Sequence, residues 1–125
     1  MTTAPSQRLH LLPGEFVIDH LPGERSAPDD SWFSLVRAPE GLTVIREHEG
    51  GRAVGDLWIG LYGGDSAHAL DLPGMLAALV GPLAAAEVPV FVASTFHADV
   101  LLVPWSRRDE AIRVLRGAGH EVAAG

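Results

Sequence analysis

The chain has 125 residues, of which 47% are hydrophobic and 20% are charged. This composition is typical of a globular protein rather than a disordered one, and the length fits one compact domain or two very small units. The formal net charge is −7 and all nine basic residues are arginine, which argues against nucleic acid or an anionic membrane surface as a partner. The lack of cysteine excludes disulfides and cysteine-bearing zinc sites.

Two segments bear on localisation. Residues 1–7 are small and polar and lack the apolar stretch of a secretory signal. The longest nearly uncharged run, residues 72–86, is too short and too interrupted by Gly and Pro to cross a bilayer. We therefore expect a cytoplasmic protein with no membrane partner.

The first half of the chain is predicted to be rich in β-strands. After a loose terminus at residues 1–8, apolar and β-branched runs predict four strands. These strands are expected at 9–12, 16–21, 32–37 and 42–47. Turn-forming residues predict a loop at 22–31 and a tight turn at 38–41. Glycines and alternating charges between residues 47 and 56 mark the best internal boundary.

The second half is predicted to alternate between strands and helices. Strands are expected at 57–62, 88–95, 100–105 and 120–122. Asp71 is expected to cap a helix that runs to residue 86, with a kink near Gly81 because Pro82 removes one hydrogen bond. Ser106 is expected to begin a second helix, with Asp109 completing a capping box.

Both predicted helices carry an apolar stripe. In the first helix the stripe is Leu72, Met75, Leu76, Leu79 and Leu83, and in the second it is Ala111, Ile112, Val114, Leu115 and Ala118. Leu76 and Leu79 are expected to be buried against the neighbouring strands. The order βαββαβ predicts an α+β, ferredoxin-like unit, an antiparallel sheet with two helices on one face.

Few residue patterns suggest catalysis or metal binding. Of the six histidines, only His97 lies near a carboxylate, Asp99, in a turn between strands. A metal site needs three or four converging ligands, so we expect a solvated turn histidine and no bound metal. No serine lies in a Gly-x-Ser-x-Gly elbow, and no lysine is present for a phosphate loop. We therefore expect neither a cofactor nor an enzyme activity.

The start of the first helix, at Leu72 to Gly74, and the turn at 94–99 offer the three features of a free amino acid site. A helix N-terminus presents N–H groups and a positive dipole end to a carboxylate. Asp99 offers a negative charge to an ammonium group. Phe96 offers an apolar wall.

Four stretches carry a recognisable motif. They are Leu12-Pro13-Gly14-Glu15-Phe16, residues 33–45 (Phe-Ser-Leu-Val-Arg-Ala-Pro-Glu-Gly-Leu-Thr-Val-Ile), Leu72-Pro73-Gly74-Met75-Leu76, and residues 94–103 (Ser-Thr-Phe-His-Ala-Asp-Val-Leu-Leu-Val). In this order the chain resembles the small bacterial ACT-domain proteins related to the CASTOR-type amino acid sensors. The resemblance spans residues 9–122, which makes it far more specific than any single motif.

The resemblance implies tandem ACT-like units, the first degenerate and β-rich at residues 9–56 and the second a full ACT domain at 57–125. It implies a non-catalytic regulatory module that binds a free amino acid at the contact between such units. Phe96 and Asp99 carry over as lining residues, and Gly74 as the point where the backbone meets the ligand. The candidate ligand-binding residues are therefore Leu72, Gly74, Phe96 and Asp99.

A second hypothesis stays open, because several positions depart from the family pattern. Pro73 has no N–H to donate, and Ala98 and Val100 replace a Thr and a Tyr. The alternative is a ligand-free structural or protein-interaction ACT domain, and an enzyme of unrecognised type is a third reading. In either ACT reading we expect a homodimer with two-fold symmetry, because exposed sheet edges and the apolar helix need cover.

Overall fold

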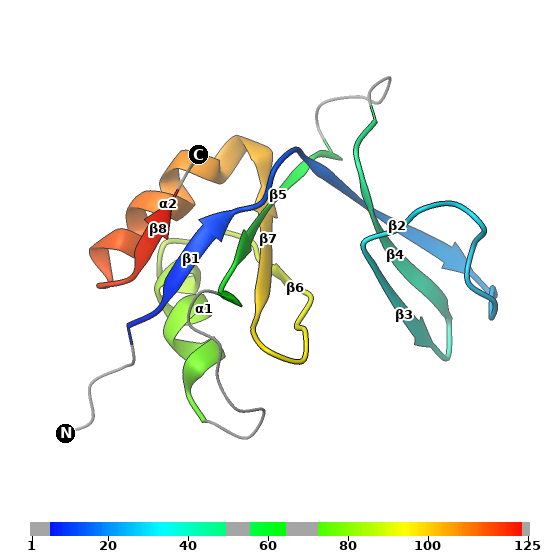
Figure 1. Ribbon diagram of the computed structural model, residues 1–125, viewed down its shortest axis with the longest axis horizontal. Helices are drawn as coiled ribbons and strands as arrows, with labels where there is room; N and C mark the ends of the chain where they lie inside the picture. Colours follow the sequence, from blue (N-terminus) through cyan, green and yellow to red (C-terminus); the bar gives the residue numbers. More distant parts are fainter. Residues whose placement is uncertain (1–5, 50–55, 65–72, 124–125) are drawn as a thin grey trace. The chain divides into compact units, whose positions relative to one another are not determined.

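The computed structural model describes residues 6–49, 56–64 and 73–123. In these residues, eight strands and two α-helices make a mixed α+β fold (Figure 1). The contacts group the chain into two compact units. One is Met1–Pro13 together with Ile59–Gly125, and the other is Gly14–Trp58. No helix in the described part of the chain is long and apolar enough to cross a membrane.

The 14–58 unit is built on an antiparallel hairpin and one further strand. Its strands are β2 (Phe16–Pro22), β3 (Ser34–Ala38) and β4 (Gly41–Glu47), paired in the order β3-β4-β2. Gly41 closes the β3–β4 turn with φ 139°, where a Cβ atom would lie 2.3 Å from the Leu21 carbonyl oxygen. Glycine is therefore required there. The three strands that the sequence predicted are present, but Pro22, predicted to begin the loop, belongs to β2, and β3 begins at Ser34 rather than at Trp32.

The other unit carries a five-stranded sheet in the order β8-β1-β5-β7-β6. Its strands are β1 (Arg8–Leu11), β5 (Trp58–Tyr62), β6 (Phe91–Val92), β7 (Val100–Pro104) and β8 (Glu121–Ala123). Strand β1 pairs in parallel with β8 and antiparallel with β5. The segment at 8–11 therefore lies between the first and last strands of the βαββαβ order formed by residues 58–123.

The sequence predicted a loose terminus that includes residues 7 and 8. The structure shows that both residues are instead held in place. Gln7 is 2% exposed, and its carbonyl oxygen accepts the Glu121 N–H at 2.9 Å. Arg8 is the first residue of β1 and forms an ion pair with Glu121 at 2.9 Å. A polar residue at a chain end gives no sequence signal for such pairing. The predicted domain ranges 9–56 and 57–125 divide the chain differently from the two contact units and stay a prediction.

The two helices begin later than the sequence predicted. Helix α1 spans Met75–Ala85 with Gly74 as its N-cap, and no side chain caps it. Asp71, the predicted cap, lies outside the described residues. Helix α2 spans Arg108–Gly117 after a 3₁₀ turn, η3, at Trp105–Arg107.

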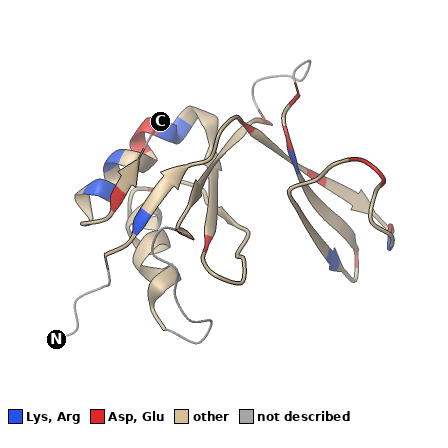
Figure 2. Cartoon of the chain, viewed as in Figure 1, with Lys and Arg blue, Asp and Glu red and all other residues tan. Residues whose placement is uncertain are grey.

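The predicted capping box of the second helix is wrong. Ser106 lies inside the 3₁₀ turn, and Arg107 is the N-cap of α2 without a side-chain hydrogen bond. The Asp109 carboxylate instead forms an ion pair with Arg108 at 2.6 Å. Figure 2 shows that α2 carries charges of both signs, whereas α1 carries none.

The strand predicted at 88–95 is much shorter in the structure. Strand β6 is limited to Phe91 and Val92, which pair with β7, and the Ala93 N–H adds one bond to the Val100 carbonyl oxygen at 2.9 Å. Pro89 cannot donate a ladder hydrogen bond, and residues 94–99 are used by a turn. The strand predicted at 100–105 is confirmed as β7, except that Trp105 belongs to the 3₁₀ turn.

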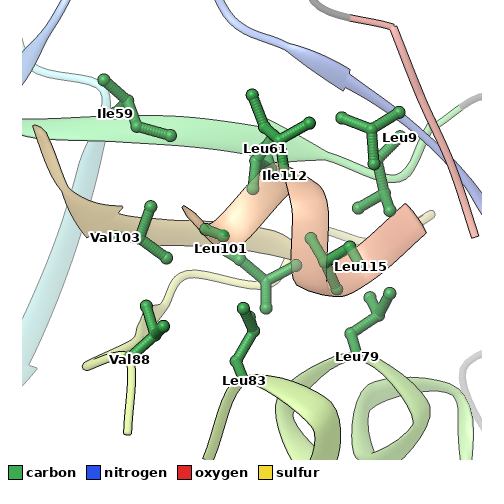
Figure 3. Close-up of a cluster of buried hydrophobic side chains, with 12 residues drawn as sticks. Leu9, Ile59, Leu61, Leu79, Leu83, Val88, Leu101, Val103, Ile112 and Leu115 are labelled. Atoms are coloured by element: carbon green, nitrogen blue, oxygen red, sulfur yellow. The ribbon is translucent and has the colours of Figure 1, made fainter. Parts of the chain in front are cut away.

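One buried cluster joins both helices to one face of the five-stranded sheet. Figure 3 shows Leu79 and Leu83 of α1 directed toward Leu101, with Leu115 of α2 beside them. The remaining members of the cluster are Leu9, Ile59, Leu61, Val88, Val103, Ala111, Ile112 and Val122. Leu79 is fully buried, as predicted, but Leu76 is 36% exposed and the prediction for it is wrong. Ala78 is buried instead.

His120 ties β1 and α1 together from its place before β8. It is 5% exposed, its Nδ1 accepts the Gln7 N–H at 3.1 Å, and its Nε2 lies 2.9 Å from the Ala78 carbonyl oxygen. Because Nδ1 accepts a hydrogen bond, the ring proton lies on Nε2 and is donated to Ala78. One neutral imidazole therefore satisfies two backbone groups of segments far apart in sequence.

Leu79→Ala is expected to lower the free energy of unfolding by about 2–5 kcal/mol, because it opens a cavity in the cluster of Figure 3. Leu76→Ala is the matched control on the same helix and should change it by no more than about 0.5 kcal/mol. Urea denaturation of both variants measures the difference. Equal losses of unfolding free energy in the two variants would contradict the finding that Leu79 is buried and Leu76 is not.

His120→Leu is expected to lower the free energy of unfolding by about 2–4 kcal/mol, because it leaves two buried backbone groups without partners. The control is His20→Leu, at an exposed position of β2, which should stay within about 0.5 kcal/mol. Urea denaturation compares the two variants. A loss at His120 no larger than at His20 would show that the ring is not a structural link.

Candidate functional site

The turn between β6 and β7 is closed by its own hydrogen bonds. The Thr95 N–H donates to the Ala98 carbonyl oxygen at 2.8 Å, and the Thr95 hydroxyl accepts the Ala98 N–H at 3.1 Å. The His97 N–H also reaches that hydroxyl, at 3.3 Å. A hydroxyl that bonds backbone groups two and three residues ahead stabilises a tight turn. Thr95 therefore fixes the backbone that leads into Asp99.

Asp99 is a buried carboxylate at the end of this turn. It is 6% exposed, and its Oδ1 accepts a hydrogen bond from the Ser94 hydroxyl at 2.7 Å. Its carbonyl oxygen accepts the Gly63 N–H at 3.0 Å, which attaches the turn to the end of β5. Burial of a charge is costly unless hydrogen bonds compensate, so Ser94 contributes directly to holding Asp99 in place.

The start of α1 lies at Gly74. This residue has φ 85°, in the left-handed region that favours glycine, and a Cβ atom there would meet no described residue within 4 Å. Its carbonyl oxygen accepts the first helical hydrogen bond, from the Ala78 N–H at 3.0 Å. No acidic residue lies in the first turn of the helix. The helix start can therefore receive a negatively charged group from outside.

Gln7 bonds the start of α1 and lies near Gly63, whose N–H bonds the Asp99 carbonyl oxygen. The Gln7 side-chain amide donates to the Met75 carbonyl oxygen at 2.7 Å. Two oxygens lie close to Gly63, the Gln7 Oε1 and the Asp99 carbonyl oxygen. They are 3.9 Å and 3.7 Å from the position that a Cβ atom of Gly63 would take. The start of α1 and the β6–β7 turn accordingly lie at the same end of the five-stranded sheet (Figure 1).

The predicted site residues are distributed as follows. Gly74 and Asp99 lie at this end of the sheet, and Asp99 is buried. Phe96 is 71% exposed and packs edge-on against His97, with ring centroids 5.1 Å apart. Leu72 lies outside the described residues. Among the described residues no group of three or more His, Asp or Glu is placed to hold a metal ion.

Three residues of this region were missed or misread in the sequence. Gln7 was placed in a loose terminus, and nothing in a polar N-terminal segment indicates its burial. The sequence indicated neither the bond from the Gly63 N–H to the Asp99 carbonyl oxygen nor the bond from the Ser94 hydroxyl to the Asp99 carboxylate. The spacing of five residues between a hydroxyl and an acid across a tight turn is the one signal that could have indicated this contact.

Ser94→Ala is expected to lower the free energy of unfolding by about 1–3 kcal/mol, because it removes a hydrogen bond to a buried charged group. Ser106→Ala, at an exposed position of the 3₁₀ turn, is the control and should stay within about 0.5 kcal/mol. Urea denaturation measures both. If the loss at Ser94 persists undiminished in an Asp99→Ala background, which has no acceptor for the hydroxyl, the hydrogen bond is not its cause.

Comparison with known proteins identifies the family. The ACT domain model matches residues 53–117, just over half of the chain. Protein Atu0741 from Agobacterium tumefaciens has a similar structure, with a TM-score of 0.82 and 25% identity over 98% of this chain and 96% of that one.

A second solved structure is similar in fold. It is VC0802 from Vibrio cholerae, described as a protein of unknown function and possible transport protein. Its TM-score is 0.74 and its identity 22%, over 90% of this chain and 89% of that one. No curated protein matches the chain. The match to the domain model and the described α+β architecture agree, and the chain belongs to the ACT domain family.

Proposed function

We propose that this protein is a non-catalytic regulatory module that binds a free amino acid. ACT domains commonly bind amino acids in a regulatory role, and the family match covers the segment that contains Gly74, Phe96 and Asp99. The observation that carries the proposal is the position of Asp99, a buried carboxylate in an ordered turn at the same end of the sheet as the start of α1.

The charges of a free amino acid suit the two parts of this region. Its ammonium group would be held by the Asp99 carboxylate, whose 6% exposure reduces screening by water. Its carboxylate would be held by the N–H groups at the start of α1, near Gly74, together with the positive end of the helix dipole. Phe96, 71% exposed, would cover the apolar part of the ligand.

The assembly belongs to the same proposal. The ligand would lie at a contact between ACT-like units, the first of them degenerate at residues 9–56, as in the CASTOR-type sensors that the sequence resembles. A cytoplasmic homodimer with two-fold symmetry would bring such units together. The exposed Phe96 supports a contact of this kind, because its ring leaves apolar surface in water.

The test is a thermal-shift screen of the twenty amino acids on the wild type and Asp99→Asn. A ligand at about 100 times its dissociation constant stabilises the native state by about 2.7 kcal/mol, which for a chain of this size raises Tm by roughly 5–15 °C. One or a few amino acids should shift the wild type. Asp99→Asn should not respond, because truncating a charged partner weakens affinity by roughly 30- to 5,000-fold.

Asp109→Asn provides the matched control, since it removes the same charge from an exposed position of α2. This variant should respond as the wild type does. Equal shifts in the wild type and Asp99→Asn would show that Asp99 is not the ammonium partner. No shift with any amino acid in the wild type would contradict amino acid binding.

A ligand-free interaction domain is the second candidate function, and one observation favours it. The Ser94 hydroxyl already satisfies an oxygen of Asp99 at 2.7 Å, which leaves less of that carboxylate for a ligand. In this case the exposed Phe96 would serve an interface with a second copy. Light scattering should then give the mass of two chains for the wild type and of one chain for Phe96→Ser, with no amino acid altering either result.

A further inference from the structure

A cavity of about 220 Å³ lies within the 14–58 unit, and it shares no lining residue with the proposed amino acid site. It is formed where the β2–β3 connection meets the end of β4. Its lining residues are Asp30, Ser31, Trp32, Phe33, Arg46, Glu47 and Glu49. Figure 2 shows acidic residues on both of these segments.

Among the described residues of this lining, Arg46 is the only basic one, and acids already engage it. The Arg46 Nε donates to Asp30 Oδ2 at 2.5 Å, and its Nη1 donates to Asp19 Oδ2 at 2.7 Å. The hydrogen bond from Arg46 lowers the pKa of Asp30, so that carboxyl stays ionised. Two carboxylates thus offset one guanidinium, and Glu47 and Glu49 add further negative charge. The cavity consequently has a negative potential, in a chain whose net charge is −7.

Two aromatic side chains form the apolar part of the wall. Trp32 is 40% exposed and Phe33 is 38% exposed, so each offers surface to a ligand. Phe33 is held in place by an edge-on contact with the buried Phe16, with ring centroids 5.1 Å apart. Its N–H also donates to the Ile45 carbonyl oxygen at 2.7 Å. The Phe33 part of the wall is therefore held in place by its own neighbours.

We propose that this cavity binds a small organic cation of the alkylammonium class. Aromatic faces attract cations through their quadrupole, most strongly for Trp, and they also accept the alkyl groups around the charge. The carboxylates supply the opposite charge. An inorganic cation would leave the aromatic wall unused, and an anion would be repelled. The volume is below the roughly 300–1,000 Å³ of drug-sized sites, which restricts the ligand to a few heavy atoms.

The three tryptophans give a direct measurement. Each indole N–H produces its own NMR signal in the ¹⁵N-labelled protein, and Trp32 lines the cavity whereas Trp58 and Trp105 do not. The probes are choline and butylamine at low ionic strength. Titration should shift the Trp32 signal to saturation at millimolar concentration and leave the other two signals in place. The neutral carbon analogue of choline, in which carbon replaces the nitrogen, is the control for charge.

Two variants test the wall and the charge separately. Trp32→Leu should weaken binding about 3- to 10-fold. Because this variant lacks the Trp32 indole signal, its binding is measured from the NMR signal of the Phe33 backbone amide. Glu47→Gln with Glu49→Gln should weaken it about 10-fold at low salt. The matched control is Glu24→Gln with Glu40→Gln, which removes two charges near the opposite end of the same hairpin and should leave affinity within about 2-fold at the same salt.

Each outcome bears on the proposal. Saturable shifts of Trp32 by either cation, weakened by the cavity variants and not by their control, support it. The absence of a saturable Trp32 shift with both cations overturns it. An equal response to the neutral analogue, or equal weakening in the Glu24 and Glu40 control, overturns it as well. Because the cavity shares no residue with the Asp99 region, failure here leaves the amino acid proposal unaffected.

Discussion

Strand β1 lies between β5 and β8, and the order of the five-stranded sheet depends on that pairing. Without β1, a gap one strand wide would separate β5 from β8, and the two strands could not pair with each other. Gln7 extends the pairing to the helices, because its backbone bonds His120 and its side chain bonds Met75 at the start of α1. The same short segment therefore completes the sheet and fixes the end of the helix where the candidate site lies.

The two regions with a proposed ligand differ in how they are held. Around Asp99 the order comes from the backbone, since Thr95 and Ser94 use their hydroxyls to fix a tight turn and a buried charge. In the cavity of the 14–58 unit the order comes from side chains, since Arg46 holds Asp30 and Phe16 holds the ring of Phe33. In both cases the groups that would meet a ligand are positioned by neighbours rather than by the ligand itself.

Most strands and both helices could be predicted from the sequence because their apolar periodicity reflects one buried face. The predictions failed where the sequence allows more than one packing arrangement for a residue. Leu76 fits the apolar stripe of α1 as well as Ala78 does. In the helix that begins at Met75, however, Ala78 faces the core and Leu76 is exposed to solvent. The motif singled out Asp99, whose role as a ligand-binding residue stays a prediction. The burial of Gln7 was not predicted, because it depends on pairing with a segment 113 residues away.

That separation affects how the chain can fold. The parallel pairing of residues 8–10 with 121–123 joins segments that leave the ribosome far apart in time. Strand β1 can pair with β5 as soon as residues 61 and 62 are made, but its other side stays unpaired until β8 has been synthesised. Contacts of such long range slow folding, and an unpaired strand is exposed to other chains meanwhile. The 14–58 hairpin, built from local contacts, is free to form first.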